Sequence, residues 1–158
     1  LLQNVNKLIS KAVLIILLIF SVNFLINFFS ITPYQYTYLN ILNGKSEKFY
    51  KKFENDYWAS SIKELVAKVD FDKSEIINIA DCGVNVRVTE NYFNKNGYFI
   101  NFVSPKNAQY IIMTNRALVE IGNNNKYLFT NCFEKFKGND LFIVKRNNLL
   151  LSTIRKLN

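Results

Sequence analysis

Histidine is absent from this chain of 158 residues, which also holds only five glycines, two prolines, two cysteines and one tryptophan. Without histidine, neither a Cys-His catalytic dyad nor a metal site with imidazole ligands can form. Asp81, Cys82 and Gly83 stand between a predicted strand and a predicted helix, as in a phosphate-binding turn, but the G-x-G-x-x-G glycines are missing. We therefore expect an ordinary turn at Gly83, and the sequence predicts no catalytic residue, cofactor or metal site.

The two cysteines, Cys82 and Cys132, are fifty residues apart and match no metal-binding spacing. We interpret them as small buried hydrophobic residues with inert thiols. One disulfide between them is the alternative, if the domain that carries them lies in an oxidising compartment.

Charge is missing from one long stretch, because no Lys, Arg, Asp or Glu lies between Lys11 and Lys45. Within it, residues 12–29 read AVLIILLIFSVNFLINFF. At about 1.5 Å of rise per residue they form roughly 27 Å of helix, close to the hydrocarbon thickness of a bilayer. The pattern predicts a transmembrane helix over 12–30. A cleaved signal peptide, the alternative, normally has a shorter apolar region and a small-x-small cleavage site.

The net charge of +8 is spread among acidic residues and favours a solvated basic surface over a nucleic-acid site. Lys7 and Lys11 precede the span, whereas the next positive charge after it is Lys45. The positive-inside bias therefore predicts a cytoplasmic stub over 1–11 and an extracytoplasmic location from residue 31 onward. The expected partner is the lipid bilayer and not nucleic acid, which would require the inverted topology.

A polar stripe interrupts the apolar segment, where Asn23, Asn27 and Ser30 recur at helical spacing. Amides are costly in lipid, so we expect this face to contact other membrane helices. Asparagines tolerated near the interface in a compositionally biased chain are the alternative. Because only eleven residues precede the span and the first is Leu1, we expect a piece of a larger protein with upstream membrane helices.

Residues 31–54 are interpreted as the segment that leaves the membrane. Pro33 is expected to end the helix, since proline lacks an amide donor and restricts the residue before it. Tyr34, Tyr36 and Tyr38 follow at every second position and are predicted to form an aromatic belt at the level of the lipid headgroups.

Residues 55–158 have the pattern of a soluble α/β domain with a mixed sheet and a C-terminal hairpin. The hairpin is expected to turn at Asn147 and Asn148, since asparagine tolerates positive φ. Asn55 or Asp56 is expected to cap the first helix. The expected elements are a helix over 55–69, a strand over 75–83, a helix over 85–95, strands over 98–103 and 108–114, a helix over 125–137 and the hairpin over 141–157.

Glu54 and Asp56 form the one close acid pair near the predicted membrane face. Two carboxylates at this position suit the binding of a cation or of a sugar hydroxyl. The alternative is structural, because acidic side chains at the start of a helix are stabilised by its dipole.

These residues together resemble a family signature, P-Y-Q-Y-x-Y-x-N followed by F-E-x-D-Y-W-x-x-S. The pattern resembles bacterial membrane glycosyltransferases similar to the dolichyl-phosphate-mannose-protein mannosyltransferases, of GT-C type. The chain departs from it at Ala59, where glycine is common, and at Thr32, where histidine often precedes the proline. The matching positions taken as a membrane-exit or acceptor-side motif are Pro33, Tyr34, Gln35, Tyr36, Tyr38, Asn40, Glu54, Asp56, Tyr57 and Trp58.

The resemblance implies transfer of a sugar from a polyprenyl-phosphate donor on the periplasmic side of a bacterial inner membrane. In such enzymes the catalytic acid lies in the first extracytoplasmic loop, far upstream of the matching residues. The motif residues are therefore expected to pack the domain against the membrane helices or to line the approach of the acceptor. The alternative function is non-enzymatic: a single-span module that binds a partner or stiffens a complex of the cell envelope.

Overall fold

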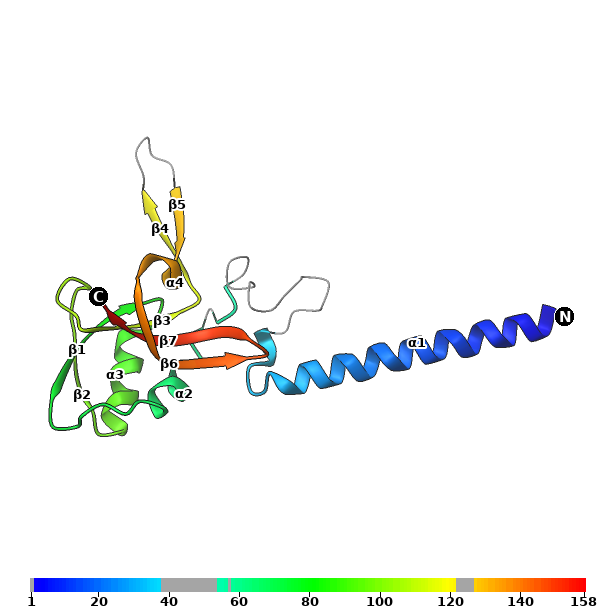
Figure 1. Ribbon diagram of the computed structural model, residues 1–158, viewed down its shortest axis with the longest axis horizontal. Coiled ribbons are helices and arrows are strands. Elements are labelled where there is room, and N and C mark those ends of the chain that lie inside the picture. Colours follow the sequence, from blue (N-terminus) through cyan, green and yellow to red (C-terminus); the bar gives the residue numbers. More distant parts are fainter. Residues whose placement is uncertain (1, 38–53, 57, 122–126) are drawn as a thin grey trace.

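A long helix, α1 (Leu2–Ser30), extends from a small α/β domain in the computed structural model of this chain (Figure 1). The structure describes residues 2–37, 54–56, 58–121 and 127–158. The predicted fold class is confirmed, because one N-terminal apolar helix precedes an α/β domain with a mixed sheet and a C-terminal strand hairpin.

One part of α1, Ile9–Ser30, is long and apolar enough to cross a membrane. None of these 22 residues is buried against the rest of the protein. The helix ends at Ser30, before the cis Thr32–Pro33 peptide, as the position of Pro33 predicts. The chain then makes one turn of 3-10 helix, η1 (Gln35–Thr37), against the domain.

A mixed sheet of five strands, in the order β2-β1-β3-β7-β6, forms the centre of the domain as far as the structure describes it. Strand β1 pairs in parallel with β2 and β3, whereas β7 runs antiparallel to β3 and β6. The turn between β6 and β7 has φ of 47° at Asn147 and 63° at Asn148, as predicted. The strands are β1 (Ile76–Cys82), β2 (Phe99–Phe102), β3 (Tyr110–Thr114), β6 (Gly138–Arg146) and β7 (Leu149–Leu157).

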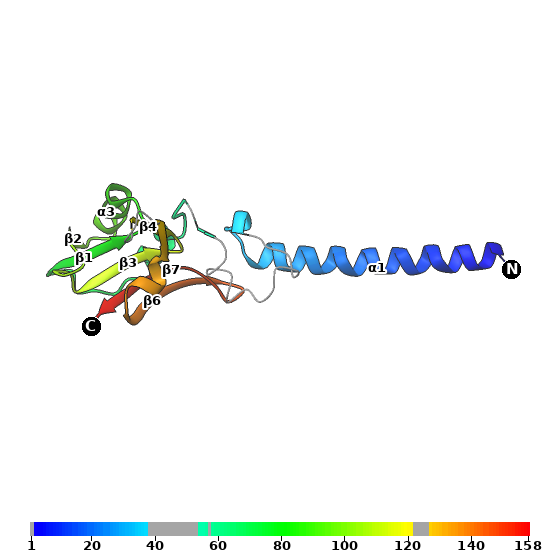
Figure 2. The same ribbon diagram turned by 90° about the horizontal axis from the view of Figure 1, so that it is seen from above.

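Helices α2 (Ile62–Ala67) and α3 (Val86–Lys95) lie on one face of this sheet, and Figure 2 shows α3 in that position. The Asn85 side chain caps α3 by accepting a hydrogen bond from the Val88 amide. The main hydrophobic core lies between the helices and the sheet. Its fully buried members are Leu65, Val66, Ile79, Phe93, Ile112, Val144, Leu151 and Ile154.

Gly83 occupies the turn between β1 and α3 with a φ of +78°. A Cβ atom there would lie 2.7 Å from Arg116 Cβ and 2.8 Å from Thr114 Oγ1. Glycine is therefore required at this position by both its backbone conformation and its neighbours, in agreement with the predicted strand-to-helix turn.

The opposite face of the sheet carries a second core and a disulfide. Cys82 at the end of β1 is bonded to Cys132 at the start of α4 (Cys132–Lys135), with the two Cα atoms 5.8 Å apart. The interpretation of both cysteines as inert thiols is therefore wrong. They are buried, as expected, but they join the sheet to a helix fifty residues further along the chain.

The helix predicted over 125–137 is also wrong. Residues 127–131 form β5, which pairs with β4 (Ala117–Ile121) in an antiparallel ribbon that projects from the domain (Figure 1). Within the described residues 127–137, only Cys132–Lys135 are helical, beginning where the Asn131 side chain accepts a hydrogen bond from the Phe133 amide. Pairing with β4 over five residues outweighs the helical spacing of the apolar side chains in this segment.

Candidate functional site

Tyr34 is inserted into the domain immediately after the end of α1. Its exposed fraction is 4%, and its hydroxyl donates to Glu64 Oε2 on α2 at 2.9 Å. The Arg146 guanidinium lies 5.1 Å from the centroid of the Tyr34 ring, in cation-π geometry. The prediction that this ring belongs to an aromatic belt exposed to headgroups is wrong, because the ring belongs to the main core of the domain.

Glu64 is the centre of a charged cluster. Its carboxylate accepts hydrogen bonds from Arg146 Nη2 at 2.5 Å and from Tyr34, and Lys68 Nζ lies 2.9 Å from Oε1. Burial alone would raise the pKa of Glu64, but the hydrogen bonds from Arg146, Lys68 and Tyr34 outweigh it and lower the pKa to about 2. The carboxylate is therefore ionised at neutral pH and holds Tyr34 in place.

Tyr36 reaches a second carboxylate, that of Asp56. The Tyr36 hydroxyl donates to Oδ1, and the backbone amides of Ser60 and Ser61 donate to Oδ1 and Oδ2 at 3.0 and 3.1 Å. The Ser61 hydroxyl also donates to Oδ2 at 2.5 Å and contacts the hydroxyl of Ser152 on β7 at 2.6 Å. Asp56 is fully buried, so these donors replace the water that its charge has lost.

Burial, followed by hydrogen bonding to Glu64 and Asp56, raises the pKa of Tyr34 and of Tyr36. Both hydroxyls therefore stay protonated at neutral pH and act as donors. We call Tyr34, Tyr36, Asp56, Glu64 and Arg146 the exit dock, because they fasten the segment that follows α1 to the domain.

The turn that begins at Asp56 differs from the predicted helix over 55–69. Helix α2 begins only at Ile62, and neither Asn55 nor Asp56 is its N-cap residue. The Asp56 carboxylate instead accepts hydrogen bonds from the amides of Ser60 and Ser61 in the turn before the helix. This places an acid near the positive end of the α2 dipole. The backbone of Ala59 in this turn has a φ of 53°, a conformation that glycine adopts without strain.

Glu54 and Asp56 do not share a set of donors. Glu54 Oε1 accepts a hydrogen bond from the Ala117 amide at the start of β4, at 2.6 Å. Within the described ranges no group of three or more His, Cys, Asp or Glu residues is arranged to hold a metal ion. Both acids of the predicted pair thus have structural partners, one on the ribbon and one in the exit dock.

The other predicted motif residues have different environments. Gln35 donates to the Thr32 hydroxyl at 2.7 Å, and the Trp58 side chain is 80% exposed. Tyr38, Asn40 and Tyr57 lie outside the described residues.

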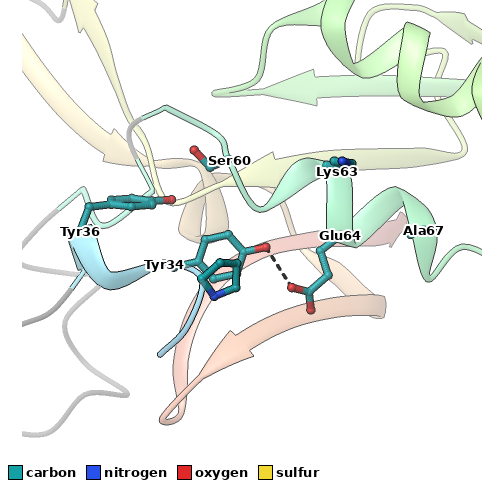
Figure 3. Close-up of a pocket in the computed structure, with 7 residues that line it drawn as sticks. Tyr34, Tyr36, Ser60, Lys63, Glu64 and Ala67 are labelled. Atoms are coloured by element: carbon teal, nitrogen blue, oxygen red, sulfur yellow. Dashed lines mark hydrogen bonds between the residues drawn. The ribbon is translucent and has the colours of Figure 1, made fainter. Parts of the chain in front are cut away.

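An open groove lies beside the exit dock, with a volume of about 480 Å³ (Figure 3). Pro33, Tyr34 and Tyr36 line one side, and residues of α2 and the turn before it line the other. The lining on that second side consists of Ser60, Lys63, Glu64 and Ala67. The lining combines aromatic rings, the Lys63 ammonium group, the Glu64 carboxylate and the Ser60 hydroxyl, a mixture that suits binding.

The polar stripe of α1 continues into the domain. Asn27 Nδ2 donates to the backbone and side-chain oxygens of Asn23 at 2.8 and 3.0 Å, and Ser30 Oγ donates to the carbonyl of Asn27. The Asn147 side chain in the β6–β7 turn donates to Ser30 Oγ. Asn23 and Asn27 of the stripe are thus hydrogen-bonded to each other within α1, and Ser30 at its C-terminal end is bonded to the β6–β7 hairpin.

Glu64 and Arg146 are functional candidates that the sequence did not indicate. Glu64 and Lys68 have the spacing of a helical ion pair, but nothing in the sequence links them to Arg146, 82 residues away from Glu64.

Comparison of this chain with models of protein families found no match, and neither did comparisons with curated proteins and with solved structures.

Proposed function

We propose that this chain is the C-terminal membrane helix and extracytoplasmic domain of a membrane glycosyltransferase that uses a polyprenyl-phosphate sugar. The domain does not carry the catalytic acid in this proposal. It is held at the outer end of the last membrane helix and stiffens the periplasmic side of the enzyme.

One observation carries this proposal: residues from both halves of the glycosyltransferase-like motif meet in the exit dock. Tyr34 and Tyr36 come from the first half of the motif, and Asp56 comes from the second half. Tyr36 bonds directly to Asp56, twenty residues away, and Tyr34 bonds to Glu64, which lies outside the motif. A signature explained by composition alone would not require a tyrosine of its first half and the acid of its second half to meet.

Ala59 supports the resemblance independently. The family pattern commonly has glycine here, and the backbone of this chain has the positive φ that favours glycine. The backbone at residue 59 therefore has the conformation that the glycine of the family pattern favours, although this chain has alanine there.

Two observations support the periplasmic location. Structural disulfides persist in oxidising compartments and are rare in the cytosol, and Cys82 and Cys132 are bonded. Lys7 and Lys11 lie on the other side of the apolar segment, as the positive-inside rule requires for an external domain.

The complete open reading frame tests the proposal first. The expected result is several further apolar spans with an acidic residue in the first extracytoplasmic loop. In the full-length protein, Asp56→Asn should lower sugar transfer to the acceptor, because it weakens the exit dock. Lys95→Gln on α3 is the matched control and should leave transfer unchanged. A reading frame with a single span would contradict the proposal.

A single-span binding module of the cell envelope is the second candidate, and the β4–β5 ribbon favours it. Val119, Ile121 and Phe129 on this ribbon are 57%, 73% and 72% exposed. Exposed apolar side chains on a projecting ribbon are typical of a protein-binding surface. A single-span reading frame, together with retention of the domain's fold in isolation, would support this candidate.

A further inference from the structure

The groove beside the exit dock lies close to the end of the apolar helix. Pro33, which lines it, is three residues beyond Ser30, the last residue of α1. Three residues reach at most about 10 Å. The headgroup layer on each side of a bilayer is roughly 5–7 Å thick, from the difference between total and hydrocarbon thickness. If α1 spans the bilayer as proposed, the groove opens at the level of the headgroups.

The charges around the groove favour an anion. Lys68 and Arg146 are both bonded to Glu64, so two cations face one carboxylate there. Lys63 lines the groove and adds a third positive charge beside these two, and no ion pair joins it to another residue in the described part of the chain. With the buried Asp56 carboxylate counted, three cations stand against two carboxylates around the groove, and Lys63 is the cation that lies in the lining itself.

The remaining lining suits a lipid rather than a small ion alone. Pro33 and the ring of Tyr36, which is 52% exposed, form an apolar wall. Trp58 lies in the turn that Asp56 organises and is 80% exposed. An exposed tryptophan is favoured at a membrane interface, where its ring meets headgroups and upper acyl chains.

We infer that this groove binds the headgroup of an anionic phospholipid from the leaflet next to the domain, with the phosphate at Lys63 and the glycerol against Pro33 and the Tyr36 ring. The inference rests on the proposed membrane span of α1. Such a lipid would fix the domain's orientation on the membrane, in addition to the contacts of the exit dock.

The test uses the full chain reconstituted in vesicles of equal parts phosphatidylglycerol and phosphatidylcholine. After extraction in mild detergent, mass spectrometry measures the ratio of the two lipids that remain bound. The wild-type chain should retain phosphatidylglycerol preferentially. Lys63→Gln should reduce this preference about fivefold, because a lysine near an anionic surface contributes about 1 kcal/mol.

Two variants serve as controls. Lys63→Arg keeps the charge and should keep most of the preference. Lys95→Gln removes an exposed charge from the last turn of α3 and should leave the preference unchanged. Thermal unfolding should be the same for Lys63→Gln and the wild type, since Lys63 is exposed.

Different failures would have different signatures. If an alkaline carbonate wash removes the chain from the vesicles, the span itself is wrong and this inference fails with it. If the chain resists the wash but Lys63→Gln retains the wild-type lipid ratio, the lipid site alone is overturned. Displacement of phosphatidylglycerol by millimolar inorganic phosphate would show a site for a free anion and would overturn the assignment to lipid.

Discussion

Helix α1 and the core of the domain contain similar aliphatic residues in opposite environments. Leu18 on α1 is 65% exposed, whereas Leu65 on α2 is fully buried. The domain buries its apolar residues between its own helices and sheet, but α1 has no such cover within the described residues. The domain therefore covers its own apolar side chains, whereas those of α1 would need a bilayer or further helices to cover them.

The exit dock lies where these two regions meet. A flexible connection would let the domain rotate freely on its anchor, but here two tyrosines bond to two carboxylates within a few residues of the end of α1. Arg146 also donates to the carbonyl of Thr32 at 3.1 Å. The exit dock therefore connects the exposed helix to the domain and its buried core through polar contacts with defined geometry.

The largest effect is expected from the same truncation made in each region. Leu65→Ala should lower the free energy of unfolding of the domain by about 2–5 kcal/mol, because it leaves a cavity in the core. Leu18→Ala, the matched change on α1, should leave domain stability unchanged. Thermal unfolding in detergent micelles, followed by near-ultraviolet circular dichroism, measures both. Equal losses would show that α1 packs against the domain.

The exit dock is expected to be the next most sensitive region. Asp56→Asn should lower the free energy of unfolding by about 1–3 kcal/mol, because an amide cannot accept from all the donors that now surround the carboxylate. Asp72→Asn, an exposed acid in a loop, is the control and should have a smaller effect. If both variants unfold like the wild type, the exit dock contributes nothing to stability and does not hold the segment after α1 to the domain.

The charged cluster at Glu64 predicts a dependence on pH. Its pKa is lowered from 4.5 to about 2 in the folded protein. The unfolded state therefore binds the proton first, and the contribution of Glu64 is complete above pH 4.5 and is lost as pH falls from there toward 2. At pH 7, Glu64→Gln should be less stable by about 1–2 kcal/mol. The gap to the wild type should close at acidic pH, and a gap that is constant with pH would contradict the assignment.

The smallest predicted effect is a gain in stability. Ala59→Gly should raise the free energy of unfolding by about 1 kcal/mol, because it relieves the left-handed backbone at this position. Ala67→Gly, at the end of α2, should instead lower stability by about 0.5–1 kcal/mol. A destabilising Ala59→Gly would show that the turn at the exit dock is not strained.

Much of the fold could be predicted from local patterns. The strand over 75–83, the helix over 85–95 and the Asn147–Asn148 turn correspond closely to β1, α3 and the β6–β7 connection. In each case a β-branched run, a capping asparagine or a turn residue with positive φ acts over a few neighbouring residues.

The errors occur where contacts distant in sequence decide the structure. The segment 127–131 is a strand because β4 pairs with it, and β4 was not predicted. The burial of Tyr34 depends on Glu64 and Arg146, and the disulfide requires that β1 and α4 meet. The site residues of the motif could be chosen from the sequence, but their partners could not, since no local pattern connects residue 34 with residue 146.

The central claim is that α1 crosses the membrane and places the docked domain on its outer side. Fusion of alkaline phosphatase to Asn158, with green fluorescent protein at the same position in a second fusion, tests this topology in bacterial cells. The account predicts an active phosphatase and a dark fluorescent protein. A bright fluorescent protein with an inactive phosphatase would place the domain in the cytoplasm and contradict the account.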